Sequence, residues 1–116
     1  IIARAIAQRA RLLVMDEPTA HLDFTHELNV MEIVARLVKE SKRSIIMATH
    51  FLNQAYYLEN AGVNTKVALI NDGRFSCIGT PSEVLTEQTL EKTFNIVTEI
   101  VESGQRKYIL PLRNKR

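Results

Sequence analysis

An apolar strand that ends on two adjacent carboxylates constrains this chain more than any other feature. The segment reads Leu12-Leu13-Val14-Met15-Asp16-Glu17, and Pro18 follows it directly. Because strand side chains alternate in direction, we expect Asp16 and Glu17 to point to opposite sides. One carboxylate could then hold a hydrated Mg²⁺ ion, while the other faces a water that attacks a metal-bound phosphate. An acidic turn after an edge strand is the structural alternative.

Length and composition describe an ordinary globular chain with a modest core. The 116 residues are 46% hydrophobic and 24% charged. The net charge of +2 is too small and dispersed to indicate a nucleic-acid partner, and the basic residues of 106–116 are interpreted as a solvated tail. A single cysteine, Cys77, excludes an internal disulfide and fits a reducing compartment. No apolar run approaches the roughly 20 residues that cross a bilayer, so we expect any membrane link to run through a partner.

A second strand and an intervening helix predict a right-handed parallel crossover. Residues 12–16 and 44–49 are typical of short strands buried on both faces of a parallel sheet. Residues 25–41 carry apolar side chains at helical spacing, with Asp23 or Thr25 as the N-cap. The carboxyl ends of parallel strands meet at one edge of a sheet, where open α/β folds bind ligands. We therefore expect His50, which follows the second strand, to converge with the acidic pair, although a lone histidine there is usually a polar loop residue.

The remaining residues predict short elements. A helix is expected over 51–59, followed by an antiparallel hairpin of 66–70 and 74–78 that joins the sheet around Asn71-Asp72-Gly73. Thr80-Pro81-Ser82-Glu83 has the pattern of a capping box and opens a helix through residue 85, with another helix over 87–93. Strands are expected over 96–101 and 107–110, and residues 1–9 have a helical pattern. The predicted fold class is α/β, with a mainly parallel sheet flanked by helices and an antiparallel hairpin toward the C-terminus.

Taken together, these motifs resemble those of ATPase subunits of ABC transporters. Residues 12–23 resemble the Walker B motif and the D-loop, and Ala48-Thr49-His50 resembles the H-loop, in matching order and separation. Residues 2–7 look like the helix after the family's signature sequence, and 71–74 with 79–81 resemble the end of the same domain. The resemblance extends to about Val101. It implies a partial P-loop NTPase fold, with ATP and Mg²⁺ as cofactors.

The resemblance also implies a role for individual residues. Asp16 would bind Mg²⁺ through water, Glu17 would be the general base or water-positioning residue, and His50 would contact the γ-phosphate. The D-loop would lie in the interface of a head-to-tail dimer with a second ATPase subunit, through Ala20, His21, Leu22 and Asp23. Asp23 would reach the partner's nucleotide site and His21 would shape the loop. His21 and His26 could suggest a metal pair, but two histidines without a third ligand are weak evidence.

The chain lacks other parts of the family's pattern. None of its four glycines precedes a lysine, so no Gly-x-x-x-x-Gly-Lys-Ser/Thr phosphate loop (Walker A) is present. The glutamine loop and the signature sequence are missing too. We therefore expect residues 1–116 to be the carboxyl-terminal part of one nucleotide-binding domain that neither binds nor hydrolyses ATP usefully alone. We also expect it to self-associate through strand edges that truncation leaves open.

The expected substrate rests on similarity alone. Residues 50–55 and 79–87 are similar to ATPases of importers for iron chelates, haem and cobalamin, with zinc or manganese importers as the nearest competitors. The expected function is thus that of a fragment of an importer's ATP-hydrolysing subunit. It would bind transmembrane permease subunits at the cytoplasmic face of the cell membrane. A soluble ABC ATPase of DNA repair or ribosome work, and a non-catalytic interaction module, are the alternatives.

Overall fold

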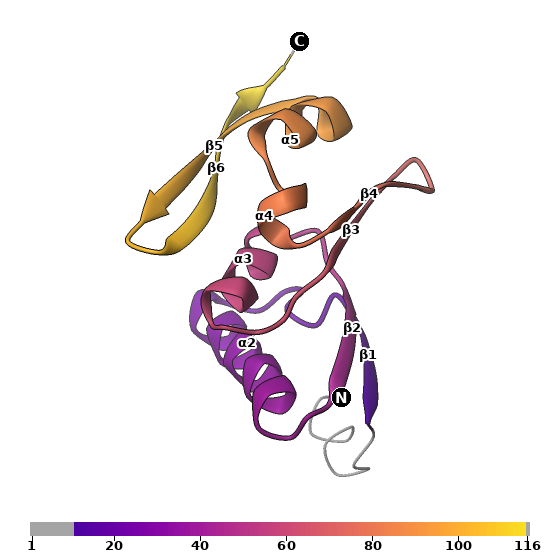
Figure 1. Ribbon diagram of the computed structural model, residues 1–116, viewed down its shortest axis with the longest axis vertical. Coiled ribbons are helices and arrows are strands. Elements are labelled where there is room, and N and C mark those ends of the chain that lie inside the picture. Colours follow the sequence, from indigo (N-terminus) through magenta and orange to yellow (C-terminus); the bar gives the residue numbers. More distant parts are fainter. Residues whose placement is uncertain (1–10, 116) are drawn as a thin grey trace. The chain divides into compact units, whose positions relative to one another are not determined.

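The computed structural model describes residues 11–115, which form two compact units. Unit 1 ends at Phe51 and unit 2 begins at Leu52. Figure 1 labels the helices and strands of both units. The helix expected over residues 1–9 lies outside the described residues. Within the described range, no helix is both long enough and apolar enough to cross a membrane.

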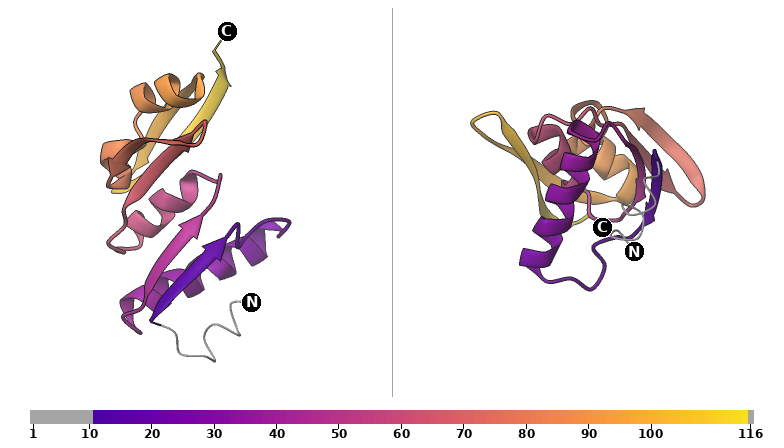
Figure 2. Two further views of the ribbon diagram at one scale, coloured as in Figure 1. Left: turned by 90° about the vertical axis from the view of Figure 1, so that its right-hand side faces the viewer. Right: turned by 90° about the horizontal axis from the view of Figure 1, so that it is seen from below.

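Unit 1 contains the crossover that the sequence predicts. Strand β1 (Leu12–Asp16), helix α2 (Phe24–Lys39) and strand β2 (Ser44–Ala48) follow one another along the chain. The two strands pair in parallel, from Leu12 opposite Ser44 to Asp16 opposite Ala48, and lie side by side in Figure 2. The carboxyl ends of β1 and β2 therefore share one edge of the sheet.

Helix α2 forms where the apolar spacing predicts it. Asp23 is the N-cap, and its side chain accepts a hydrogen bond from the backbone N–H of His26, which satisfies one of the unpaired donors of the first turn. The basic side chains of Arg36 and Lys39 lie in the last turn, where they complement the helix dipole. The helix buries one stripe of apolar residues, namely Met31, Val34, Ala35 and Leu37.

The expectation that both strands of unit 1 are buried on two faces is wrong. Leu13 and Met15 of β1 are buried, but Val14 between them is 73% exposed and Ile46 of β2 is 59% exposed. In the described part of unit 1, α2 covers one face of the two-stranded sheet and no second layer covers the other. Strand β1 is therefore buried on only one face, and the inward side chains of β2 are only half-buried.

Unit 2 consists of three helices and two antiparallel hairpins. Its first helix begins at Asn53, two residues later than expected. The backbone N–H of Phe51 donates to Oγ1 of Thr49 instead of taking part in the helix. The elements of this unit are α3 (Asn53–Asn60), β3 (Val67–Asn71), β4 (Arg74–Gly79), α4 (Pro81–Val84), α5 (Glu87–Phe94), β5 (Ile96–Ser103) and β6 (Arg106–Asn114).

Local sequence signals set the turns and helix ends of unit 2. Asp72 and Gly73 both have positive φ, 52° and 73°, the backbone that a tight two-residue hairpin turn requires. Thr80 and Glu83 form the predicted capping box, in which each side chain accepts a hydrogen bond from the other residue's backbone N–H. Asn95 ends α5 in the left-handed conformation.

The strands in the described part of the chain form three separate two-stranded sheets, one parallel and two antiparallel. The β3–β4 hairpin was expected to join the parallel sheet, but its hydrogen-bonded ladder involves only its own two strands. The last hairpin, β5–β6, is longer than predicted and continues through Pro111, which lies opposite Thr98 beside a register shift. Proline is tolerated there because an edge strand can spare one N–H donor.

Two asparagine side chains of α3 complete the hydrogen bonding of the edge of β6. Asn53 accepts from the backbone N–H of Ile109 at 2.7 Å and donates to its carbonyl at 3.0 Å. Asn60, two helical turns later, makes the same two bonds to Lys107, each at 3.2 Å. Helix α3 thus takes the place of a neighbouring strand along the edge of β6. The buried core of unit 2 consists of Tyr56, Leu69, Val84, Leu85, Leu90 and Ile109.

Candidate functional site

The two parallel strands of unit 1 bring their polar ends together, as the sequence predicts. Asp16 is the last residue of β1 and pairs with Ala48, the last residue of β2. The backbone N–H of Glu17 continues the ladder by donating to the carbonyl of Ala48 at 2.8 Å. His50 lies two residues beyond this point. A shared sheet edge therefore carries all three side chains that were predicted to converge.

Within this group, Glu17 and His50 are in direct contact. The Nδ1 atom of His50 lies 2.9 Å from Oε1 of Glu17. An ionised carboxylate can only accept hydrogen bonds, so Nδ1 carries the proton and donates it to Glu17. The imidazole side chain is 71% exposed and the carboxylate side chain only 33%. The pair therefore opens to solvent on the histidine side.

The second carboxylate oxygen of Glu17 is buried without a partner. Among the described residues, no group donates a hydrogen bond to Oε2. A buried carboxylate oxygen normally has a donor, because removing it from water otherwise carries a free-energy cost. Oε2 is thus a buried acceptor for which the described residues supply no donor.

Backbone geometry sets the direction of the Glu17 side chain. Its φ is 49°, in the left-handed region that side chains other than glycine rarely adopt, and the backbone N–H of Ala20 donates to its carbonyl at 3.1 Å. Glu17 has therefore left the strand, and this turn, rather than strand alternation, directs it toward His50. Such strain is often found at functional sites.

Asp16 lies at the same edge but makes a different contribution. It is exposed at the end of β1, and an accessible carboxylate is a ligand type that a hydrated Mg²⁺ ion accepts. The described residues contain no group of three or more His, Cys, Asp or Glu side chains arranged as a metal cage. The donors present therefore fit a cation that keeps most of its waters and do not fit a tightly caged metal such as Zn²⁺.

The loop that follows Glu17 contains the residues predicted to lie at a dimer interface. Thr19 is buried, at 3% exposure, and its carbonyl accepts from the backbone N–H of Leu22 at 3.2 Å. His21 has a φ of 65°, in the left-handed region. Ala20 is half-buried, whereas His21, Leu22 and Asp23 are exposed. The loop is thus anchored by Thr19 and presents its last three side chains to solvent.

Asp23 ends this loop as the N-cap of α2, one of the two caps that the sequence offered, and makes a further contact with the His26 ring that sequence reasoning missed. Its Oδ1 atom accepts two hydrogen bonds from His26, one from the backbone N–H at 2.9 Å and one from Nδ1 at 2.7 Å. These bonds, the backbone bond first and the ring bond second, hold the pKa of Asp23 below its usual value. The three-residue spacing on a helix start was the available signal.

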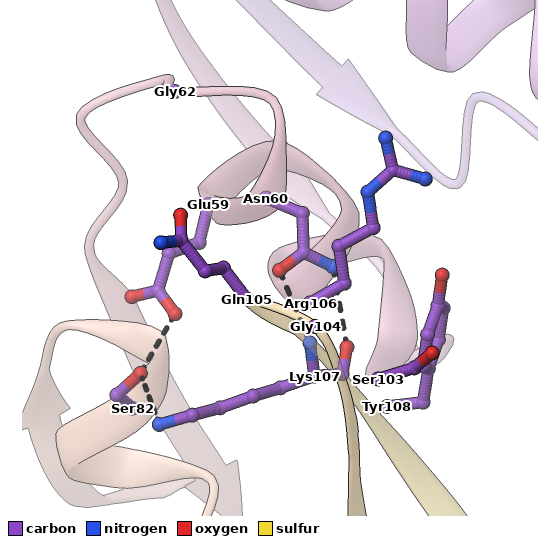
Figure 3. A pocket seen from close by; sticks show the side chains of 10 residues that line it. All are labelled: Glu59, Asn60, Gly62, Ser82, Ser103, Gly104, Gln105, Arg106, Lys107 and Tyr108. Atoms are coloured by element: carbon purple, nitrogen blue, oxygen red, sulfur yellow. Dashed lines mark hydrogen bonds between the residues drawn. The ribbon is translucent and has the colours of Figure 1, made fainter.

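A second concave region lies wholly within unit 2 and contains none of the predicted site residues (Figure 3). Its volume is about 860 Å³, and it is bounded by α3, α4 and the β5–β6 turn. Nζ of Lys107 donates to Oγ of Ser82 at 3.3 Å, and Ser82 donates to Oε1 of Glu59 at 2.7 Å. The polar groups of this pocket are thus largely engaged with one another, and we do not place the candidate site there.

Curated proteins with similar sequences are named as import ATP-binding proteins. The chain is 36% identical over 112 residues to the petrobactin import ATP-binding protein FpuC of Bacillus anthracis, covering 97% of this chain and 39% of the relative. It is 39% identical over 100 residues to the iron(3+)-hydroxamate import ATP-binding protein FhuC of Bacillus subtilis, covering 86% and 35%. It is 37% identical over 102 residues to the hemin import ATP-binding protein HmuV of Streptomyces coelicolor, covering 85% and 33%.

Solved structures agree on the fold. A metal-chelate type ABC transporter in an inward-facing conformation matches 97% of this chain and 43% of its own, with a TM-score of 0.78 and 24% identity, which shows the fold alone. CbiO1 of Clostridium perfringens, part of the ABC transporter complex CbiONQ, matches 81% of this chain and 36% of its own, with a TM-score of 0.62 and 29% identity. No family model matches the chain. The chain spans about two fifths or less of the length of these curated relatives.

Proposed function

Because the chain belongs to the ATP-binding proteins of ABC transporters, we propose that it supplies the hydrolysis side of a nucleotide site that powers import. The bond between His50 and Glu17 carries this proposal. It fixes one oxygen of the carboxylate and leaves Oε2 buried and without a partner among the described residues. That oxygen would accept a hydrogen bond from the attacking water and orient it.

Asp16 and His50 complete the proposed site. Asp16 would hold a hydrated Mg²⁺ ion, which when bound neutralises charge on the phosphates. His50 donates through Nδ1 to Glu17, and a hydrogen bond from its second ring nitrogen to the terminal phosphate would require that nitrogen to carry a proton as well. None of the glycines in residues 1–116 precedes a lysine, so these residues contain no glycine-rich phosphate loop. The backbone contacts that such a loop makes with phosphates would have to come from other residues. We accordingly propose that residues 1–116 form the carboxyl-terminal part of one nucleotide-binding domain.

The exposed loop suggests the first partner. Residues 20–23 follow the site directly and end in three exposed side chains. We propose that this loop lies in a head-to-tail interface with a second ATPase subunit, where Asp23 approaches the partner's nucleotide site. Transmembrane permease subunits would be the other partners, and would hold the ATPase at the cytoplasmic face of the membrane.

The transported substrate is proposed from the relatives' names. FpuC, FhuC and HmuV are named for import of petrobactin, iron(3+)-hydroxamate and hemin, and a relative in Halobacterium salinarum, 36% identical over 95 residues, is named for cobalamin import. These cargoes are metals held in organic chelators or macrocycles. We propose a cargo of this class, namely an iron chelate, haem or cobalamin, rather than free Zn²⁺ or Mn²⁺.

Uptake by cells tests this function. Cells without the gene and cells with the gene restored would be given radiolabelled iron chelates, haem, cobalamin, Zn²⁺ and Mn²⁺ in parallel. The proposal predicts that uptake of one chelated cargo is lost and then restored, while Zn²⁺ and Mn²⁺ uptake is unchanged. Loss of Zn²⁺ or Mn²⁺ uptake alone would overturn the substrate class. Unchanged uptake of every cargo would overturn the transport function.

A further inference from the structure

The imidazole of His26 makes a contact to which the proposed function gives no role. Both of its bonds to Asp23 end on the same carboxylate oxygen, Oδ1. The backbone bond is an ordinary N-cap interaction that any residue at position 26 would make. The ring bond, at 2.7 Å, is additional and depends on the identity of the side chain.

We propose that His26 is a positioning residue for the D-loop, which fixes the Asp23 carboxylate so that Oδ2 is left to accept a bond from the second ATPase subunit. The inference rests on the proposed function, in which Asp23 approaches the partner's nucleotide site. Oδ1 receives both donors from His26, and Oδ2 takes neither of them. The two oxygens of Asp23 thus have different tasks.

Hydrogen bonding, and not burial, has to hold this carboxylate in place. The side chains of Asp23 and His26 are 66% and 67% exposed, so packing restrains neither of them. One bond to Oδ1 would leave the carboxylate plane free to rotate about that contact. A second donor from a different direction removes this freedom, because both bonds keep good geometry in only one orientation.

Neither a metal site nor a simple helix cap accounts for the ring contact of His26. A metal site shared with His21 lacks support, since the described residues contain no group of three potential ligands. Two other titratable residues are close to His26 in sequence, namely Glu27 in the first turn of α2 and His21 in the loop. The ring of His26 nevertheless makes its contact with Asp23. A purely capping role would require the backbone bond alone.

The covalent structure of asparagine provides a matched test. Nδ2 of an asparagine occupies the same position along the side chain as Nδ1 of a histidine, and it donates a hydrogen bond without carrying a charge. His26→Asn therefore preserves the proposed contact, whereas His26→Ala removes it. Neither variant removes the backbone N–H, so both keep the N-cap bond and are expected to fold.

Carbon-13 NMR titration of the Asp23 carboxyl group tests the proposal on the full chain. The backbone bond and the ring bond both lower the pKa of Asp23. The expected result is an upward shift of the Asp23 midpoint in His26→Ala, because the ring bond is lost while the N-cap bond remains. In His26→Asn the midpoint should return toward the wild-type value.

Two results would overturn the positioning role. The first is an unchanged midpoint in His26→Ala, which would show that the ring bond has no effect. The second is a shift in His26→Ala that His26→Asn fails to reverse, which would assign the effect to imidazole charge. The titration needs no nucleotide, partner or transport, so its outcome is separate from that of the uptake experiment.

Discussion

The Nδ1 atom of His50 and the Oε1 atom of Glu17 lie 2.9 Å apart, although 33 residues separate them in sequence. The contact exists because β1 and β2 pair in parallel and end together, with Asp16 opposite Ala48. The left-handed backbone of Glu17 then turns its carboxylate toward the imidazole. A hydrogen-bonded pair with one unused buried oxygen is the arrangement from which the proposed hydrolysis follows.

The isolated chain should bind ATP poorly. We expect a Kd on the order of 1 mM or weaker, because the loop whose backbone N–H groups would surround the phosphates is absent from the sequence. Isothermal titration calorimetry with Mg²⁺-ATP measures this directly, with Mg²⁺ alone as the control. A micromolar Kd would contradict the assignment of the phosphate contacts to other residues.

The open apolar face of unit 1 should make the chain self-associate. Val14 is 73% exposed, and within residues 11–115 its sheet has two strands, each with an unpaired edge with which another chain can pair. Light scattering coupled to size-exclusion chromatography should show a mass that rises with concentration. Val14→Lys should shift the mass toward the monomer, because a charged edge disfavours strand pairing.

A matched substitution in unit 2 controls for the general effect of adding a lysine. Ile78 of β4 is similarly exposed, at 66%. Ile78→Lys should leave the mass unchanged if association runs through unit 1. A wild-type chain that stays monomeric at all concentrations, or an equal response of both variants, would count against association through β1.

The sequence predicted unit 1 well because its signals are local and of the right period. The apolar run of β1, the helical spacing of α2 and the chemistry of parallel crossovers together placed Glu17 beside His50. Burial was misjudged because a wholly apolar strand predicts that both faces of its sheet are buried. The strand's own residues do not show whether another layer of the protein packs on each face. Val14 and Ile46 are exposed for that reason.

Long-range partners in unit 2 could not be predicted from the sequence. Asn53 and Asn60 look like ordinary polar residues at the ends of a helix, and nothing local connects them with Ile109 and Lys107. The bond from the ring of His26 to Asp23 was also missed, because the three-residue spacing at the helix start indicates proximity but does not show that the ring turns toward the carboxylate. These contacts depend on side-chain geometry that spacing alone does not specify.

The bonds from Asn53 to β6 should be measurable in hydrogen exchange. Asn53→Ala removes a donor and an acceptor from Ile109, at an expected cost of about 1 kcal/mol in unfolding free energy. The backbone amide of Ile109 should then exchange faster than in the wild type. Asn64→Ala, at an exposed loop position, is the control. Equal exchange at Ile109 in both variants would show that α3 does not complete the edge of β6.

Alkaline pH should destabilise unit 2 through Tyr56. This side chain is 1% exposed, and its hydroxyl donates to the carbonyl of Leu85 at 2.8 Å. Burial, with a smaller contribution from Glu59, raises the pKa of Tyr56 above its usual value of 10.0. The neutral form is thus favoured in the folded state, so its contribution to stability is complete below pH 10.0 and is lost as the pH rises through the folded-state pKa.

The Tyr56→Phe variant separates these effects. At neutral pH it should lose about 0.5–1.5 kcal/mol of stability with the hydrogen bond to Leu85. Above pH 10.0 it should show a smaller further loss than the wild type, since no phenol remains at this position to ionise. Urea unfolding followed by circular dichroism at pH 7 and at alkaline pH would measure both. An equal loss of unfolding free energy at alkaline pH in the wild type and in Tyr56→Phe would show that ionisation of Tyr56 is not the cause.

The Glu17→Gln variant of the complete ATPase that carries this sequence tests the central claim most directly. Glutamine keeps the size of the side chain and can accept a hydrogen bond from His50, but it cannot act as a base. We predict ATP binding close to that of the wild type and turnover lower by about 10²-fold or more. Glu32→Gln, at an exposed position of α2, should leave both unchanged. Hydrolysis by Glu17→Gln at the wild-type rate would contradict the account.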